Sequence, residues 1–333
     1  MMTTTSKNGA LGLLSGGLDS QLAVRLLQRQ GITVRTIVFN NPFYDISAAV
    51  KAAAALEVPL RIYDFTDAIL ALIKNPPHGF GKCMNPCIDC HALMLRRAGD
   101  LLAEEGCRFL FTGEVLNERP MSQTRRALQT VAADSAYADL VLRPLSALSL
   151  PPVKPEREGW VDRQQLLNLN GRRRTTQFAL AREFGLQSYP SPAGGCLLAD
   201  VSLGRRLATF YREQAQFTVN DIRLHLVGRQ FRLPGGGWLA MGRNDVENQR
   251  IENLAQPGEV RLATVDRPGP VALLRFATDP ADRLAAAGLI ARYAKKGPPW
   301  PAEVVVEISD ANEMAEQVNV SPLTEKVFEG WRR

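Results

Sequence analysis

The sequence predicts an α/β protein: a doubly wound parallel sheet followed by a second, smaller α+β domain. From position 10 to position 111, short apolar or β-branched segments alternate with longer segments whose apolar residues recur with helical spacing. After Tyr211 the pattern changes, and glycine, proline and short apolar runs recur toward the end. A length of 333 residues also favours more than one domain, and we place the two domains at residues 1–210 and 211–333.

The individual elements follow from the same patterns. In the first domain, strands are expected at 10–14, 33–39, 59–63, 108–111 and 140–142. Helices are expected between them at 18–29, 46–56, 66–74, 88–105 and 164–185. The segments 75–86 and 150–159 are rich in proline and are expected to be loops or connectors. In the second domain, strands are expected at 238–242, 259–263, 271–276 and 304–308, with helices at 246–254 and 280–293.

Composition and charge exclude several classes of protein. Hydrophobic content of 45% and charged content of 22% are ordinary for a globular protein, and no apolar run is long enough to cross a bilayer. The first nine residues lack a secretory core, so we expect a cytoplasmic protein with no membrane partner. A net charge of +6 permits a polyanionic partner without requiring one. The cysteine count is five, with three inside positions 83–90, which argues against a disulfide framework and favours metal, iron–sulfur or sulfur-transfer chemistry.

The segment Ser15-Gly16-Gly17-Leu18-Asp19-Ser20 lies between the first predicted strand and the first predicted helix. A helix N-terminus presents unpaired N–H groups and the positive end of its dipole, and glycines let these amides close on an anion. The alternative is a glycine-rich turn that only starts a helix. The segment lacks the lysine of a Walker loop and resembles the SGGxDS signature of PP-loop ATP pyrophosphatases. The resemblance implies an adenine nucleotide alpha hydrolase-like fold in which Ser15, Gly16, Gly17, Asp19 and Ser20 bind ATP, with Asp19 near Mg²⁺ and acting in catalysis.

Other residues at strand ends are expected to face the same crevice. Ligands of parallel sheets lie beyond the carboxyl ends of the strands. Phe39 ends the second predicted strand, where PP-loop folds hold the adenine, and Thr112 and Gly113 end the fourth. We therefore add these three residues to the predicted nucleotide site. Glu114 follows directly, either as part of that site or as a carboxylate in a turn.

The cysteines allow two main interpretations. Cys87 and Cys90 form a C-x-x-C pair, and Cys196 follows two glycines about a hundred residues later. In the first interpretation these three thiols hold a [4Fe-4S] cluster with one iron open to a sulfide. In the second, Cys90 and Cys196 act as catalytic residues that carry a persulfide and then form a transient disulfide, which requires thiolates of lowered pKa at the helix beginning near Ile88. We favour the cluster.

Three other arrangements of these thiols remain open at this stage. Cys83, Cys87 and Cys90 have the spacing of radical SAM enzymes, although here they follow three βα units. Zinc bound by the same three thiols and His91 is a further alternative. Cys107 precedes a predicted strand and is expected to be a buried, inert thiol.

Several motifs together resemble a bacterial group of PP-loop proteins similar to the ThiI and MnmA tRNA thiolases. The motifs are Asn85–His91, Thr112–Val115, Arg119–Gln123, Arg143–Ser146 and Gly194–Leu198. The tail, at Met241–Asn244, Glu247-Asn248 and Asp266–Pro270, resembles an NFACT-R-type RNA-binding domain. The segment before the glycine loop is too short for a THUMP domain, and no rhodanese domain is found, so RNA binding is expected to fall to the tail and sulfur to come from elsewhere.

These resemblances imply an ATP-dependent tRNA sulfurtransferase. A carbonyl oxygen of a uridine or related base attacks the α-phosphate of ATP, pyrophosphate leaves, and sulfur then displaces AMP. The expected partners are tRNA and a sulfur donor, either sulfide or a cysteine desulfurase persulfide, and the sequence leaves room for a homodimer. Arg119, Arg172 and Arg174 are expected to contact RNA, although a solvated basic face is the simpler reading of any one arginine. The rival functions are an adenylating ligase or amidotransferase acting on a small molecule, which needs no thiols, and a non-catalytic RNA-binding factor.

Overall fold

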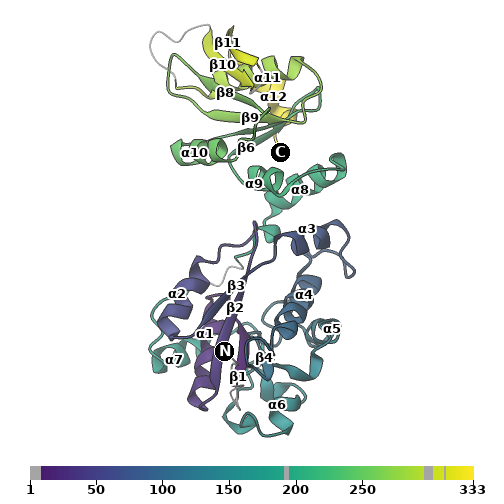
Figure 1. Ribbon diagram of the computed structural model, residues 1–333, viewed down its shortest axis with the longest axis vertical. Coiled ribbons are helices and arrows are strands. Elements are labelled where there is room, and N and C mark those ends of the chain that lie inside the picture. The colour runs from purple at the N-terminus through teal and green to yellow at the C-terminus, as the bar shows by residue number, and fades with distance from the viewer. Residues whose placement is uncertain (1–8, 191–194, 296–302, 311–312) are drawn as a thin grey trace. The chain divides into compact units, whose positions relative to one another are not determined.

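The computed structural model describes residues 9–190, 195–295, 303–310 and 313–333 (Figure 1). The chain divides into two compact units, Met1–Gly204 and Arg205–Arg333. The division falls inside helix α8 (Val201–Glu213). None of the helices in the described part of the chain combines the length and the apolar composition that a bilayer crossing requires.

A five-stranded parallel sheet forms the centre of the first unit (Figure 1). Its strands are β1 (Gly9–Leu13), β2 (Thr33–Asn40), β3 (Leu60–Asp64), β4 (Phe109–Phe111) and β5 (Val141–Leu142). They lie in the order β3-β2-β1-β4-β5, and all neighbouring strands are parallel. Because the chain runs outward from β1 and then returns to its other side at β4, the predicted doubly wound sheet is confirmed. Ligands of such sheets bind where this order reverses, beyond the carboxyl ends of β1 and β4.

Helices connect these strands or follow the last of them, and the first two share a core with the sheet. The helices are α1 (Leu18–Arg29), α2 (Ser47–Leu56), α3 (Thr66–Lys74), α4 (Cys87–Asp100), α5 (Arg125–Asp134), α6 (Lys154–Arg157) and α7 (Thr175–Glu183). The apolar spacing predicted α1 and α3 at their observed ends. One core cluster joins α1 through Val24 and Leu27, α2 through Leu56, and β4 through Phe109 and Phe111.

Two helices are several residues shorter than predicted, and two were not predicted: α5, and α6, which lies in the segment expected to be a loop or connector. The helix expected at 164–185 is only α7, because the backbone before it bonds elsewhere: Leu167 N–H donates to the Pro144 carbonyl and Gly171 N–H to the Leu116 carbonyl. The helix expected at 88–105 ends at Asp100 and continues as turns. Helix α5 was missed although its buried residues Ala127, Leu128, Val131 and Ala132 have helical spacing and Thr124 caps it by accepting the Ala127 N–H.

An antiparallel sheet of six strands forms the second unit. Its strands are β6 (Arg229–Arg232), β7 (Trp238–Met241), β8 (Val260–Thr264), β9 (Val271–Arg275), β10 (Val304–Asp310) and β11 (Glu313–Val320), in the order β11-β10-β8-β9-β7-β6. The helices are α9 (Val219–His225), α10 (Asp245–Asn253), α11 (Ala281–Tyr293) and α12 (Glu325–Phe328). The four predicted strands and two predicted helices are present. β6, β11, α9 and α12 were not predicted, because they are short or polar.

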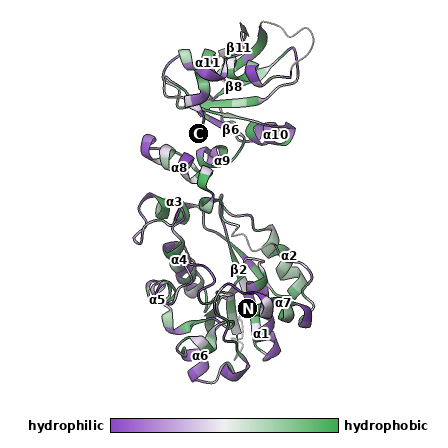
Figure 2. Ribbon diagram, turned by 180° about the vertical axis from the view of Figure 1, so that it is seen from behind, coloured by the Kyte–Doolittle hydropathy of each residue, from purple (hydrophilic) through white to green (hydrophobic). Residues whose placement is uncertain are grey.

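The core of the second unit lies between α11 and the sheet. Ala286, Leu289 and Ile290 of α11 are buried against Leu262 of β8 and Val306 of β10. Figure 2 shows α10, by contrast, as a hydrophilic helix, and Ile251 is its buried residue. The second unit is therefore an α+β domain, as predicted.

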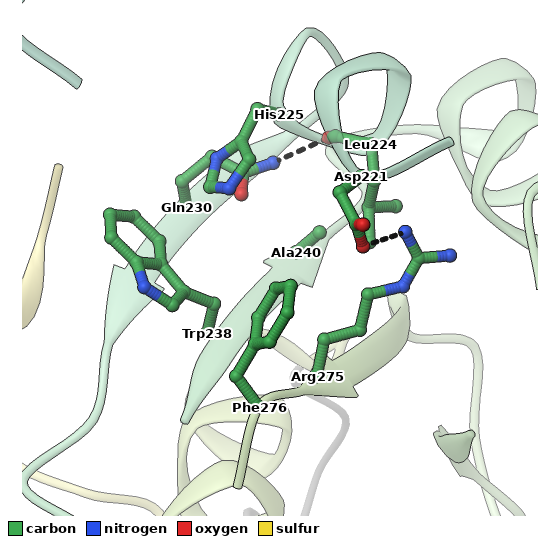
Figure 3. Close-up of a pocket in the computed structure, with 8 residues that line it drawn as sticks. All are labelled: Asp221, Leu224, His225, Gln230, Trp238, Ala240, Arg275 and Phe276. Carbon is green, nitrogen blue, oxygen red and sulfur yellow. Dashed lines mark hydrogen bonds and ion pairs between the residues drawn. The ribbon is translucent and has the colours of Figure 1, made fainter. Parts of the chain in front are cut away.

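A small cavity with room for about one water molecule lies under α9 (Figure 3). Asp221 accepts a hydrogen bond from Arg275 at 2.8 Å, and the Gln230 amide donates to the Leu224 carbonyl at 2.8 Å. The His225 ring lies 4.7 Å from the Trp238 ring, nearly perpendicular to it. His225 Nδ1 and Trp238 Nε1 are buried and have no hydrogen-bond partner among the described residues. A cavity of this size suits a structural water that would satisfy such groups, and it is too small for a nucleotide base.

Candidate functional site

The glycine segment lies at the carboxyl end of β1, where the strand order reverses. Helix α1 begins inside it at Leu18, with Gly17 at the N-cap and no side chain capping the helix. Gly16 has a φ of +80°, and a Cβ there would lie 2.3 Å from the carbonyl carbon of Ala48. Only glycine fits this position. A helix start that is free of a side-chain cap and reached by a tight glycine turn is an anion-binding arrangement.

The serines and the end of β4 fix the shape of this loop. Ser15 Oγ lies 3.3 Å from Ser20 Oγ, and the Ser20 hydroxyl donates to the Gly17 carbonyl at 2.8 Å. A Cβ at Gly113 would lie 2.5 Å from the Ser20 nitrogen, so Gly113 allows β4 to lie directly against the start of α1. Thr112 is buried, and its hydroxyl donates to Glu114 Oε2 at 3.0 Å. Gly113 thus borders the loop, whereas the Thr112 side chain faces Glu114.

Phe39 was predicted to end the second strand, but β2 ends one residue later at Asn40, and the Phe39 ring is buried. The ring centroid lies 5.5 Å from that of Tyr63 and 5.2 Å from that of Phe65, within an aromatic cluster on the sheet. Any contact of Phe39 with an adenine would therefore come from its backbone.

Asp19 carries an unsatisfied oxygen at the start of α1. Its Oδ2 accepts a hydrogen bond from Arg174 at 3.1 Å, while Oδ1 is buried and has no partner among the described residues. Burial raises the pKa of Asp19, and the charges of Arg174 and Arg119 only partly oppose this. Arg174 also lies 3.5 Å from Glu118 Oε1. A free carboxylate oxygen beside an anion-binding loop is the kind of ligand that Mg²⁺ prefers.

The three arginines expected to contact RNA differ in their surroundings. Arg119 and Arg172 are exposed, and Arg119 lies close enough to Asp19 to influence its titration. The Arg174 side chain is 11% exposed and points inward to Asp19 and Glu118. Arg119 and Arg172 are accessible to a large partner, whereas Arg174 belongs with the glycine loop.

Cys87 and Cys196 lie close enough to Cys90 to influence the titration of its thiol, and Cys87 also influences the titration of Cys196. Cys87 is the first residue of α4, and the Asn85 side-chain amide donates to its Sγ at 3.1 Å. Burial raises the pKa of the Cys90 thiol, and Cys196, Cys87 and Asp89 raise it further. Burial likewise raises the pKa of Cys196. The expectation that the helix start supplies a thiolate of lowered pKa at Cys87 or Cys90 is therefore wrong for Cys90, because burial and the neighbouring groups raise its pKa.

All five cysteines are free thiols. In the described ranges, no three His, Cys, Asp or Glu side chains are arranged to hold a single metal ion, so the zinc arrangement of Cys83, Cys87, Cys90 and His91 is not formed there. Cys107 is buried, as predicted, and burial raises its pKa to about 11. Gly194, which belongs to the motif before Cys196, lies outside the described residues.

Tyr44 connects Cys196 to the glycine loop. Its hydroxyl donates to the Ser15 carbonyl at 2.7 Å, and its backbone forms an antiparallel bridge with Cys196. The Leu197 N–H donates to the Phe43 carbonyl at 2.8 Å. The sequence analysis did not identify Tyr44. Its position just after β2, at the same sheet edge as the glycine loop, is the feature that could have identified it.

A buried charged network supports the helix that carries Cys87 and Cys90. Glu114 accepts hydrogen bonds from Arg143 at 2.9 Å and pairs with His91 Nδ1 at 3.0 Å. Burial alone would raise the pKa of Glu114, but Arg143 and His91 lower it to about 2. Glu114 therefore joins the ends of β4 and β5 to α4 as a paired carboxylate, and its turn is part of the core.

Comparison with known proteins agrees with this division of the chain. Residues 5–151 match the family model described as Thiamine biosynthesis protein (ThiI), and residues 228–332 match the model described as NFACT protein RNA binding domain.

Individual relatives match the first unit. The chain is 25% identical to an uncharacterized protein of Methanocaldococcus jannaschii over 41% of this chain and 46% of that protein. It is 29% identical to a probable tRNA sulfurtransferase of Agathobacter rectalis over 42% of this chain and 36% of that protein. It is 28% identical to the tRNA-specific 2-thiouridylase MnmA of Helicobacter hepaticus over 43% of this chain and 47% of that protein. The chain therefore spans less than half the length of each of these relatives.

Proposed function

We propose, from a chain that joins a ThiI-type domain to an NFACT-type RNA-binding domain, that the protein is an ATP-dependent tRNA sulfurtransferase. It would adenylate a carbonyl oxygen of a uridine or related base and replace that oxygen with sulfur. The observation that carries the proposal is the bridge from Cys196 through Tyr44 to the glycine loop, with Cys87 and Cys90 nearby. A rival ligase would need the loop but not the thiols.

The glycine loop would hold the phosphates of ATP. The amides at the start of α1 would face the phosphates, and the buried Oδ1 of Asp19 would be a ligand for Mg²⁺, which supplies neutralising charge when bound. The loop has no lysine, so the inward-facing Arg174 would provide the cation, exchanging Asp19 for phosphate oxygens as ATP enters.

Adenylation makes a poor leaving group into a good one. The base carbonyl oxygen would attack the α-phosphorus, and the bond to the bridging oxygen of pyrophosphate would break. Sulfur would then add to the same ring carbon, and AMP would leave with the original oxygen. Burial around Asp19 and Cys90 would limit attack by water on the adenylated base.

The thiols fit either a bound cluster or a direct sulfur carrier, and the donor set favours the cluster. Three cysteines, two of which, Cys87 and Cys196, lie close enough to Cys90 to influence its titration, are the number of thiolates that hold a [4Fe-4S] cluster with one open iron. Cys87, Cys90 and Cys196 would hold that cluster, which when bound supplies an iron site for sulfide. Sulfide, or the persulfide of a cysteine desulfurase, would be the sulfur source.

The RNA would contact both units. Exposed Arg119 and Arg172 lie on the unit that carries the glycine loop, and the NFACT-type region covers residues 228–332. Arginine contacts to phosphates would give affinity, and an unpaired or flipped base would be the one that reaches the loop.

The test is a reconstituted reaction with anaerobically purified protein, Mg·ATP, sulfide and tRNA from cells lacking the gene. AMP release and a thiolated nucleoside, both measured by mass spectrometry, are expected. Cys87→Ser and Cys196→Ser should each lower thiolation at least about a hundred-fold, whereas the matched control Cys107→Ser should retain it.

Two results would replace the proposal with a rival. Full turnover of ATP to AMP by Cys87→Ala or Cys90→Ala on a small-molecule acceptor would identify a ligase. RNA binding without any AMP release would identify a non-catalytic RNA-binding factor.

A further inference from the structure

The turn after β2 is anchored before it reaches the site. Phe43 is fully buried, its N–H donates to Asn41 Oδ1 at 2.9 Å, and the Tyr44 N–H donates to the Asn41 carbonyl at 3.3 Å. The turn is therefore fixed to the sheet at its base, and the Tyr44 side chain extends from a firm support.

From this support, Tyr44 touches two segments that are far apart in the sequence. Its hydroxyl hydrogen-bonds to the Ser15 carbonyl, the residue that opens the glycine loop. Its ring lies beside Gly195, where an added Cβ would come within 3.3 Å of a ring carbon. Its backbone bridge with Cys196 and the Leu197–Phe43 hydrogen bond hold the next two residues against the same turn.

The contacts of Tyr44 with Cys196 and with Ser15 depend on different groups of the tyrosine. The Cys196 side of the turn is held by backbone pairing, which any residue at position 44 can make. The Ser15 side is held by one side-chain hydroxyl. A change at the Ser15 carbonyl, such as the loop adjusting to a bound phosphate chain, therefore has a direct route to Cys196 through the phenol of Tyr44.

We propose that Tyr44 is a positioning residue that couples occupancy of the glycine loop to the placement of the Cys196 thiol. This inference rests on the proposed function, because it assigns ATP to the loop and counts Cys196 among the thiols that serve sulfur delivery. This coupling sets the order of the two chemical steps, because sulfur is needed only after the base carbonyl has been adenylated. The coupling is reciprocal. If bound ATP changes the accessibility of Cys196 by some factor, then fixing Cys196 in place changes the affinity for ATP by the same factor.

The test uses the full chain, reduced and free of metal, and follows iodoacetamide labelling of each cysteine by peptide mass spectrometry. Tyr44→Phe keeps the ring and the backbone bridge and removes only the hydroxyl. Tyr63→Phe, which removes a phenol from the edge strand β3, is the matched control. Without nucleotide, Tyr44→Phe should raise the Cys196 labelling rate about three- to ten-fold, which corresponds to the free energy of one hydrogen bond. Tyr63→Phe should leave it unchanged, and buried Cys107 should report intact folding in every variant.

The second measurement adds Mg²⁺ and α,β-methylene-ATP, which binds without being cleaved. Both the wild-type protein and Tyr44→Phe should bind the analogue. In the wild-type protein the bound analogue should change the Cys196 labelling rate at least about three-fold, whereas in Tyr44→Phe it should leave that rate unchanged. Equal labelling of wild type and Tyr44→Phe without nucleotide, or an equal response of both to bound analogue, overturns the inference. Failure of the wild-type protein to bind the analogue contradicts the proposed function, and with it the coupling to ATP, even if the labelling difference without nucleotide remains.

Discussion

Gly16 is a residue at which the backbone leaves little freedom. Its φ of +80° lies in the left-handed region, and the space where a Cβ would stand is occupied by the Ala48 backbone. Gly17, its neighbour, has a φ of −69° and open space around it, apart from the Ser15 hydroxyl at 3.4 Å. The two adjacent glycines are therefore constrained differently: the φ angle and the Ala48 backbone require glycine at position 16, and neither restricts position 17.

Gly16→Ala should destabilise the first unit by about 1–3 kcal/mol and abolish ATP binding, because the loop must move away from α2. Gly17→Ala should melt within a few degrees of the wild-type protein. Thermal unfolding, together with calorimetric titration of ATP, distinguishes the two variants. Equal melting temperatures for Gly16→Ala and Gly17→Ala would show that the packing of Gly16 on Ala48 does not constrain the loop.

At the scale of elements, α9 places a histidine where it must stay uncharged. Burial first, then the charges of Arg206 and Arg275, lower the pKa of His225 to about 3. The folded-state pKa lies below the unfolded value of about 6.5. The stability that the neutral ring contributes is therefore complete above pH 6.5 and is lost as the pH falls from 6.5 toward 3.

Lowering the pH from 7.5 to 5.0 should thus cost the second unit about 2 kcal/mol through this residue alone. His225→Phe should remove most of that dependence, whereas His78→Gln, in the first unit, should leave it in place. The measurement is urea unfolding followed by tryptophan fluorescence in a Trp160→Phe background, which confines the emission to the second unit. An acid dependence that His225→Phe retains in full would assign it to other groups.

At the scale of the whole molecule, an excess of six positive charges should make RNA binding strongly dependent on salt. The logarithm of the tRNA affinity should fall linearly with the logarithm of the salt concentration, by at least ten-fold in affinity between 50 and 200 mM. Arg172→Ala should reduce the slope by about 1, the share of one phosphate contact. Arg29→Ala, at an exposed ion pair with Glu183, is the control. Fluorescence anisotropy with labelled tRNA measures the slopes, and an unchanged slope in Arg172→Ala would exclude that residue from the RNA contact.

Taken alone, the sequence determined the parts of this protein whose structure depends on residues close together in the chain. Apolar spacing fixed α1 and α3 at both ends, and the alternation of elements indicated the parallel sheet because hydrophobic periodicity reports on neighbours along the chain. The glycine segment was also readable, because a tight turn before a helix needs particular residues at fixed spacing.

Only the tertiary structure determined which distant residues lie near the glycine loop. Cys196 is 181 positions beyond Ser15, and Arg174 is 155 beyond Asp19. Their places depend on the order of strands and on loop backbones that bond across the sheet, such as the segment before α7 that was predicted to be helical. Cys196, which raises the pKa of Cys90 beyond the effect of burial, is likewise distant from it in sequence. Contacts of this kind leave no periodic pattern in a single sequence, since many sequences can satisfy the same local spacing while pairing different distant segments.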